Sequence, residues 1–321
     1  GTPPRGSGNA ADMGAATVGR AVAATAVGGL AALAWAHLVE VDWYTLRRFR
    51  VPVLEPGEPD LRILHVSDLH LTPYQHRKMA WVRSLAGLAP HLVINTGDNM
   101  GHVAALPSVR HAFEPLLSVP GAFVLGSNDY YGPKPKNPAR YLTADARHKR
   151  ITEHIPLPAD ELVETFGQAG WKDLTNRRDT LEVAGRRISL VGVDDPHLDR
   201  DRFPTTTRGH RAAADLRLGV THAPYRRVLD AMHADGADLI LAGHTHGGQL
   251  CLPGWGALVT NCDLDTRRAK GLHGWPGHRP DHPDARDSTW LHVSAGLGTS
   301  PYAPVRFACR PEATLLTLVA R

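Results

Sequence analysis

Short apolar runs alternate with amphipathic stretches after residue 60 of this chain, and this alternation defines the class of fold. Three of the runs have the length and composition of buried strands, and the two stretches between them carry apolar residues at helical spacing. A β-α-β-α-β order of this kind is typical of layered α/β proteins. The expected strands are Leu61–Val66, Leu92–Asn95 and Ala122–Leu125, and the expected helices are Met79–Leu88 and Val109–Leu117.

More strands are expected in the second half of the chain, with fewer helices between them. We therefore expect one folded domain over residues 61–321, and no internal repeat divides it. The further expected strands are Leu181–Val183, Ile188–Val193, Leu216–Val220, Leu239–Leu241, Ala257–Val259, Trp290–Val293 and Thr314–Val319.

Polar, chemically active side chains follow five of these strands at the point where each strand ends. Open α/β sheets place their functional sites at the carboxyl ends of the strands. A single fragment of this kind is weak evidence, because an Asp after a strand often caps a helix, but five in order are hard to obtain by chance. The fragments are Ser67-Asp68-Leu69-His70, Gly97-Asp98-Asn99, Gly126-Ser127-Asn128-Asp129, Thr221-His222 and Gly243-His244-Thr245-His246.

These residue types indicate a metal centre. Carboxylates, imidazoles and an amide without a thiolate suit divalent Mn, Fe or Zn. Six or more ligands are too many for one tetrahedral ion and suit two ions that share a carboxylate. Two such ions can clamp a phosphoryl group and provide a metal-bound hydroxide as nucleophile. The chain contains no G-x-x-x-x-G-K-[ST] and no G-x-S-x-G, which are signatures of other phosphate and ester chemistries.

The order D-x-H, G-D, G-S-N-D, H and G-H-x-H resembles the calcineurin-like metallophosphoesterase superfamily. The sequences Gly243–Gln249 (GHTHGGQ) and Gly296–Thr299 (GLGT), with Arg306 after them, resemble its bacterial membrane-associated branch. The resemblance implies a two-sheet sandwich with α-β-β-α layers. It also implies a first metal held by Asp68, His70 and His246, a bridging Asp98, and a second metal held by His222, His244 and an amide oxygen.

The third fragment departs from the pattern of this superfamily, which usually has Gly-Asn-His-Asp or Gly-Asn-His-Glu. Aligned without a gap, Ser127 replaces the amide ligand and Asn128 replaces the His that donates a proton. Shifted by one residue, Asn128 keeps the ligand role and the His is lost. We favour Asn128 as ligand, because an amide oxygen binds such ions better than a neutral hydroxyl. His197 and Asp129 are the candidates for a substitute proton donor. We assign catalysis to Asp98, Asn128, Asp129 and His222.

The N-terminal part of the chain has a different composition. Residues 21–39 contain no Lys, Arg, Asp or Glu, which is long enough to cross a bilayer. We expect disorder over residues 1–20, a hydrophobic, membrane-anchoring helix over 21–42 and a linker over 43–60. A single N-terminal anchor predicts membrane association but leaves the side of the membrane undecided, since basic residues flank the segment on both sides.

The function expected from the sequence is metal-dependent hydrolysis of a phosphate ester, on a membrane-associated or lipid-linked substrate. The alternatives are a nuclease of the same superfamily and a metal-binding scaffold without catalysis. A net charge of +4 with 6% aromatic residues does not favour nucleic acid as a partner. A basic insertion over residues 130–150 could attract an anionic substrate or lipid. The oligomeric state is not indicated.

Overall fold

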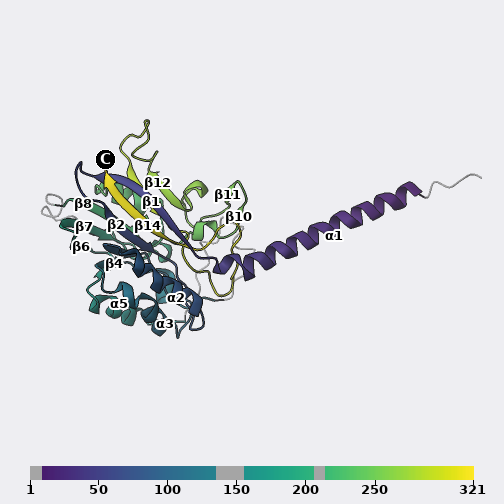
Figure 1. The fold of residues 1–321 in the computed structure, drawn as a ribbon, viewed down its shortest axis with the longest axis horizontal. Helices are drawn as coiled ribbons and strands as arrows, with labels where there is room; N and C mark the ends of the chain where they lie inside the picture. Colours follow the sequence, from purple (N-terminus) through teal and green to yellow (C-terminus); the bar gives the residue numbers. More distant parts are fainter. Residues whose placement is uncertain (1–8, 135–154, 206–213) are drawn as a thin grey trace, which may run out of the picture.

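The computed structural model describes residues 9–134, 155–205 and 214–321. Two six-stranded sheets dominate the described residues, with strand orders β1-β14-β2-β3-β4-β5 and β12-β13-β9-β8-β7-β6 (Figure 1). The first sheet consists of β1 (Thr45–Leu54), β2 (Leu61–Val66), β3 (Leu92–Asn95), β4 (Gly121–Phe123), β5 (Lys172–Asp173) and β14 (Glu312–Ala320). The second consists of β6 (Arg178–Val183), β7 (Arg186–Gly192), β8 (Leu216–Thr221), β9 (Leu239–Ala242), β12 (Gly271–Trp275) and β13 (Thr289–Val293).

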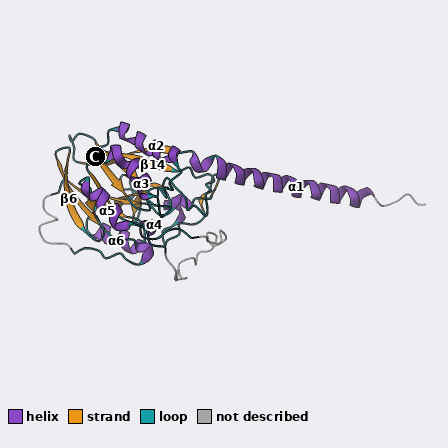
Figure 2. Ribbon diagram, turned by 90° about the horizontal axis from the view of Figure 1, so that it is seen from below, coloured by secondary structure: helices purple, strands orange, loops and turns teal. Residues whose placement is uncertain are grey.

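Helices cover the outer faces of the two sheets, as Figure 2 shows in a second view. The helices of the domain are α2 (His76–Ser84), α3 (Leu106–Phe113), α4 (Ser127–Tyr130), α5 (Ala159–Gln168) and α6 (Arg226–Ala234). Short 3₁₀ turns, among them Leu85–Leu88, Glu114–Leu116, Pro196–Leu198, His246–Gly248 and Thr266–Arg268, extend or join these elements.

The buried residues form separate layers that correspond to the expected α-β-β-α sandwich. Helices α2, α3 and α5 pack on the first sheet, as in the contacts of Phe166 with Phe113 and with Phe123. The two sheets bury a second apolar layer between them, and α6 packs on the second sheet through Leu229 and Met232. Strand β2 contributes side chains to both apolar layers, because successive side chains point to opposite faces of a strand. The expected fold class is confirmed.

Parallel pairing brings the functional strand ends to one edge of the sandwich. Strands β2 to β5 are parallel neighbours in the first sheet, and β7, β8, β9 and β13 are parallel neighbours in the second. Val66 pairs with Asn95, and Thr221 pairs with Ala242, so the polar loops that follow these residues begin side by side.

Two segments that were expected to lack regular structure form a strand and a helix instead. Strand β1 lies inside the linker expected over residues 43–60 and pairs with β14 in parallel. It forms the edge of its sheet, where Pro52 needs no partner for a missing N–H and charged side chains can face solvent. Helix α1 (Asn9–Leu38) begins inside the 1–20 region expected to be disordered, because residues 9–20 are rich in Ala, the best helix former.

The expected anchor coincides with a helix that projects from the domain (Figure 1). Residues Arg20–Asp42 form a helical region that is long and apolar enough to cross a membrane, and little of it is buried by the protein. The basic insertion expected to attract anions falls mainly on residues 135–150, which lie outside the described residues.

Candidate metal centre

Tight loops at the strand ends carry the predicted ligands in an unusual backbone conformation. Asp68, His70, Asp98, His244 and His246 all have φ between 42° and 67°. Residues other than Gly rarely adopt this left-handed region, and the strain of about 1–3 kcal/mol each persists only where the surrounding structure imposes it. The loops are tied together by backbone hydrogen bonds, among them one from the N–H of His70 to the carbonyl of Asp98 at 2.9 Å. This strain is a local signature of a functional site.

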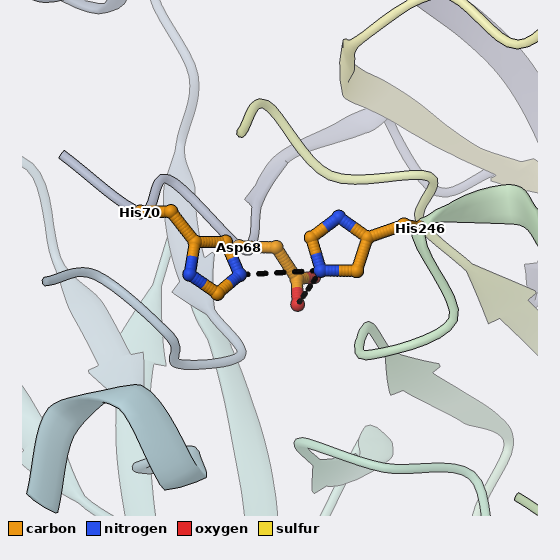
Figure 3. Close-up of side chains that lie close together, drawn as sticks. All are labelled: Asp68, His70 and His246. Atoms are coloured by element: carbon orange, nitrogen blue, oxygen red, sulfur yellow. Dashed lines mark hydrogen bonds and ion pairs between the residues drawn. The ribbon is translucent and has the colours of Figure 1, made fainter. Parts of the chain in front are cut away.

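The loops gather the predicted ligands into two overlapping groups. In Asp68, His70 and His246, one potential ligand atom of each residue lies within 4.8 Å of the others, and so do those of Asp68, Asp98 and His222. Figure 3 shows the first group, in which the Nε2 atoms of His70 and His246 are 3.2 Å apart. His246 Nε2 is also 3.7 Å from Asp68 Oδ1.

The second pair of histidines has its hydrogen-bonding roles fixed by the backbone. His222 Nδ1 donates to the Thr96 carbonyl at 2.7 Å, and His244 Nε2 donates to the Asn261 carbonyl at 3.2 Å. In the neutral rings the remaining nitrogens, His222 Nε2 and His244 Nδ1, are both bare, and they lie 3.3 Å apart. Two lone pairs that face each other are satisfied by a shared cation. The donor set therefore fits a metal ion.

Asp98 lies between the two groups. Its Oδ2 atom is 3.4 Å from His70 Nε2 and 3.6 Å from His222 Nε2. Its two oxygens accept hydrogen bonds from the backbone N–H and the side-chain amide of Asn128, at 2.7 and 2.8 Å. Asn128 is thus in contact with the centre, and Ser127 Oγ lies 3.3 Å from its amide nitrogen.

Buried negative charge sets the electrostatics of the centre. Burial by itself lowers the pKa of His222, but the charges of Asp98 and Asp195 outweigh burial and raise that pKa to about 9. Burial and the nearby Asp98 charge raise the pKa of Asp68 to about 6. Burial also favours the acid form of Asp98, but the positive charges of His222 and His70 lower its pKa below the usual range. The buried carboxylates therefore favour a positive charge beside them, whether it is a proton on His222 or a metal ion.

Glycines allow this close packing at two positions. A Cβ atom on Gly243 would overlap Ser67 Oγ, and one on Gly126 would overlap Asp98 Oδ1 and the His222 ring. The Gly residues of the third and fifth fragments are therefore required by space around the carboxylates.

Asp129 is placed differently from the other predicted site residues. Its carboxylate accepts hydrogen bonds from the backbone N–H groups of Asp98, Asn99 and Gly126 at 2.8 to 3.0 Å, and it is fully buried. The geometry therefore gives it the role of holding two site loops together. His197, the other candidate donor, lies with its ring centroid 4.6 Å from that of His244.

Two residues near the centre had no role in the sequence analysis. Asp195 is fully buried, and its Oδ2 atom has no hydrogen-bond partner among the described residues. Lys78 is buried and donates to the Leu69 carbonyl at 2.9 Å, inside the loop that carries Asp68 and His70. Neither residue belongs to a motif, and only their positions in the fold reveal them.

Arg306, which was noted only as part of the resemblance, lies beneath the loops. Its guanidinium donates to the carbonyls of Ala295 and Gly298 at 2.7 Å each and to that of Gly296 at 3.1 Å. His246 Nδ1 shares the Gly298 carbonyl at 3.0 Å. Arg306 therefore fixes the loop that orients His246.

Three curated proteins are similar to this chain over most of its length. YpbG of Bacillus subtilis strain 168 is 26% identical over 265 residues, which are 82% of this chain and 82% of that protein. Phosphodiesterase YaeI of Escherichia coli strain K12 is 25% identical over 288 residues, 88% of this chain and 91% of that protein. UDP-2,3-diacylglucosamine pyrophosphatase LpxG of Chlamydia trachomatis is 24% identical over 318 residues, 88% of this chain and 91% of that protein.

A family match covers more than half of the sequence. The sequence model described as calcineurin-like phosphoesterase matches residues 61–248, which include all the predicted ligands. The chain belongs to the calcineurin-like phosphoesterase family and is a hydrolase that acts on phosphoester bonds.

Proposed function

We propose that this chain hydrolyses a phosphate ester with two divalent metal ions of Mn, Fe or Zn. Asp68, His70 and His246 would hold one ion, His222, His244 and Asn128 the other, and Asp98 would bridge them. The observation that carries this proposal is that His222 Nε2 and His244 Nδ1 face each other at 3.3 Å beside buried carboxylates, an arrangement that needs a cation between the two rings. When bound, two such ions supply Lewis acidity and make hydroxide available as a nucleophile near neutral pH.

The side chains around the centre have separable tasks. Asn128 orients the Asp98 carboxylate through two hydrogen bonds. Thr96 and Gly298 orient the rings of His222 and His246 through their carbonyls. Proton donation to the leaving group falls to His197, because both oxygens of Asp129 already accept backbone N–H groups. A proton donor of this kind contributes about 10²–10⁴-fold to the rate.

The substrate that we propose is a phosphate ester carried by a lipid or held at a membrane. Support comes from the apolar helix at Arg20–Asp42, which has the length of a membrane anchor. LpxG, one of the relatives, is named for a pyrophosphatase activity on UDP-2,3-diacylglucosamine, an acylated molecule.

The decisive experiment measures hydrolysis of bis(p-nitrophenyl) phosphate and p-nitrophenyl phosphate by the full chain in detergent. Mn, Fe or Zn is added after treatment with a chelator, and Asp98→Asn is the control. We expect turnover that depends on the metal and is lost in the variant. The ratio of diester to monoester hydrolysis then narrows the substrate class. Turnover without metal, or unchanged turnover in Asp98→Asn, would refute the proposal.

Two alternative outcomes have their own signatures. A nuclease would show competition by DNA or RNA with a steep dependence on salt. A metal-binding scaffold would bind the ions and show no turnover of either ester.

A further inference from the structure

The β10–β11 hairpin exposes an unusual amount of apolar surface. Strands β10 (Cys251–Leu252) and β11 (Gly256–Ala257) pair in antiparallel fashion just after the His246–Gly248 turn. Trp255 at the hairpin tip is 80% exposed, and Leu252 is 50% exposed. Leu250, Leu258 and the nearby Tyr302 are exposed as well. We call these five residues the apolar platform.

The distribution of apolar side chains singles out this face. Among the described residues, the other exposed large apolar side chains lie mostly on α1 and the turn that follows it, where Trp35 and Trp43 are each 43% exposed. In the remaining described part of the chain, only Tyr74, Val103 and Ile155 are large apolar residues with exposed side chains. Exposed apolar side chains gathered in one place mark an interaction site, whereas scattered ones need no explanation.

Hydrogen bonds connect the platform to the end of α1. The segment 303–309 lies between them: its Arg306 N–H donates to the Ala36 carbonyl at 3.1 Å, and His37 Nδ1 contacts the Pro304 carbonyl at 2.7 Å. On its other side, the Cys251 N–H donates to the Phe307 carbonyl at 2.9 Å. Figure 1 shows β10 and β11 on the side of the domain from which α1 leaves. The platform and the end of α1 are therefore linked through this segment and lie on the same side of the domain.

We propose that the apolar platform inserts into the interface of a lipid bilayer, beside the point where α1 enters it. This inference rests on the membrane association proposed above. Trp and Tyr favour the boundary between water and hydrocarbon, and the Leu side chains supply apolar area that lipid can cover. Because the hairpin follows directly after His244 and His246, this docking holds the metal centre close to the membrane surface, where a lipid-linked phosphate lies.

Quenching of Trp fluorescence by lipids with brominated acyl chains tests this docking. The full chain is placed in phosphatidylcholine vesicles with and without bromine, and flotation first establishes that it is bound. The emission of Trp255 is obtained by subtracting the emission spectrum of Trp255→Phe from that of the unsubstituted chain. Trp171→Phe is the matched control, because Trp171 is 3% exposed and packs against Phe166 of α5.

We expect bromine to quench the Trp255 emission strongly and to leave the Trp171 emission unchanged. Flotation with an unquenched Trp255 would overturn the docking inference but leave the membrane association intact. A chain that does not float would overturn both. Trp255 emission that is shielded from bromine and changes with protein concentration would identify a second copy as the occupant, which also overturns the inference.

An independent observation concerns a buried chain of hydrogen bonds that ends at Asp68. His292 Nδ1 and His65 Nδ1 are 2.9 Å apart between the two sheets, and His65 Nε2 is 2.9 Å from Thr96 Oγ1. Thr96 Oγ1 lies 2.6 Å from Ser67 Oγ, and Ser67 Oγ donates to Asp68 Oδ2. All five side chains are fully buried.

The direction of this chain follows from its last member, because a carboxylate only accepts. Because the Ser67 hydroxyl donates its proton to Asp68, its oxygen accepts a hydrogen bond from the Thr96 hydroxyl. Thr96 in turn accepts from His65 Nε2, which leaves His65 Nδ1 bare and makes it accept from His292 Nδ1. His292 Nε2 is then bare, and it has no hydrogen-bond partner among the described residues. Each hydrogen bond in this series is therefore donated in the direction of Asp68.

We infer that His65 and Thr96 are positioning residues that hold the Asp68 carboxylate for the metal through Ser67. This inference rests on the proposed role of Asp68 as ligand. Residues that orient metal ligands typically contribute about 10- to 100-fold to metal affinity. We expect Thr96→Val and Ser67→Ala to weaken Mn²⁺ binding by about this factor, and Thr96→Ser to restore it, because it keeps the hydroxyl.

The matched control is Thr314→Val. Thr314 is buried, pairs with His65 across β14 and β2, and has a hydroxyl without a partner among the described residues. Calorimetry of Mn²⁺ binding to the full chain is the readout, with circular dichroism to confirm folding. Binding by Thr96→Val and Ser67→Ala that equals that of Thr314→Val would overturn the inference. Unchanged binding by Asp68→Asn would instead refute the proposed ligand and, with it, the inference.

Discussion

His222 Nε2 and His244 Nδ1 face each other at 3.3 Å, and each ring uses its other nitrogen to donate to a backbone carbonyl. Such a pair is stable only when a cation lies between its members, either a proton on His222 or a metal ion. The nearby carboxylates Asp98 and Asp68 are buried as well. Burying these two carboxylates beside two imidazole lone pairs therefore lowers the stability of the fold unless a cation lies among them.

This cost predicts that metal ions stabilise the fold. A ligand at about 100 times its Kd raises the free energy of unfolding by about 2.7 kcal/mol. We expect Mn²⁺ or Zn²⁺ to raise the Tm of the chelator-treated chain in a concentration-dependent way, and His244→Ala to reduce this shift. Differential scanning fluorimetry in detergent measures it. The absence of a shift with Mn, Fe and Zn would contradict the proposed centre.

The third fragment offers a test of which residue touches the metal. Asn128 contacts Asp98 through two hydrogen bonds, whereas Ser127 reaches the Asn128 amide at 3.3 Å. We expect Asn128→Ala to lower kcat/KM for the diester by about 10- to 100-fold, as losses at metal sites commonly do, and Ser127→Ala to change it little. The reverse order would assign the ligand to Ser127.

Restoring the usual superfamily pattern should raise the rate. The double variant Ser127→Asn, Asn128→His recreates an amide followed by an imidazole. We expect kcat for a substrate with a poor leaving group to rise, because the new imidazole adds a proton donor to His197, and the gain should stay below the about 10²–10⁴-fold that a complete donor contributes. A nitrophenyl ester should gain less, because its leaving group needs no proton. An unchanged kcat for the poor leaving group in the variant would contradict this prediction and would show that His197 alone already meets the need for a proton donor.

The sequence predicts the centre of the fold well, because local patterns determine it. The strands expected at Leu61–Val66 and Leu92–Asn95 have the same bounds in the structure. Strand β1 escaped prediction because its pairing with β14 joins segments far apart in the chain and its charged edge lacks alternation. The contacts of Arg306 and the His65–His292 pair are also products of tertiary packing, and no spacing in the sequence reveals them.

Arg306 should be hard to replace, even by lysine. Its Nη2 atom contacts three carbonyls of the segment 295–298, and its Nη1 atom lies 3.3 Å from the Cys309 carbonyl and 3.4 Å from the His246 carbonyl. The two arms of the planar guanidinium thus reach two groups of carbonyls, which the single nitrogen of a lysine cannot do. Because a buried carbonyl left unpaired costs about 1–3 kcal/mol, we expect Arg306→Lys to lower the free energy of unfolding by at least about 2 kcal/mol. Urea unfolding measures this. Arg62→Lys is the control, since Arg62 donates to the Ala89 carbonyl at the surface. A free energy of unfolding that falls no more in Arg306→Lys than in Arg62→Lys would contradict this prediction.

The buried histidines between the sheets predict a loss of stability in acid. Burial lowers the pKa of His65 from 6.5 to about 3, and burial also lowers that of His292. Both rings are neutral in the folded chain, whereas the unfolded chain binds protons on them below pH 6.5. Their contribution to stability is therefore fully present above pH 6.5 and is lost as the pH falls toward 3.

The size of this loss can be measured. Each unit of pH below the unfolded pKa removes about 1.4 kcal/mol of unfolding free energy for each histidine. Between pH 6 and 4 the unfolding free energy should fall less steeply in His292→Leu than in the parent chain. The difference should be about 1.4 kcal/mol per pH unit, because one ring no longer titrates. His111→Leu is the comparison, since His111 is exposed on α3. Urea titrations of chelator-treated protein at a series of pH values give the slopes, and parallel curves for the parent chain and His292→Leu would show that His292 does not resist protonation in the fold.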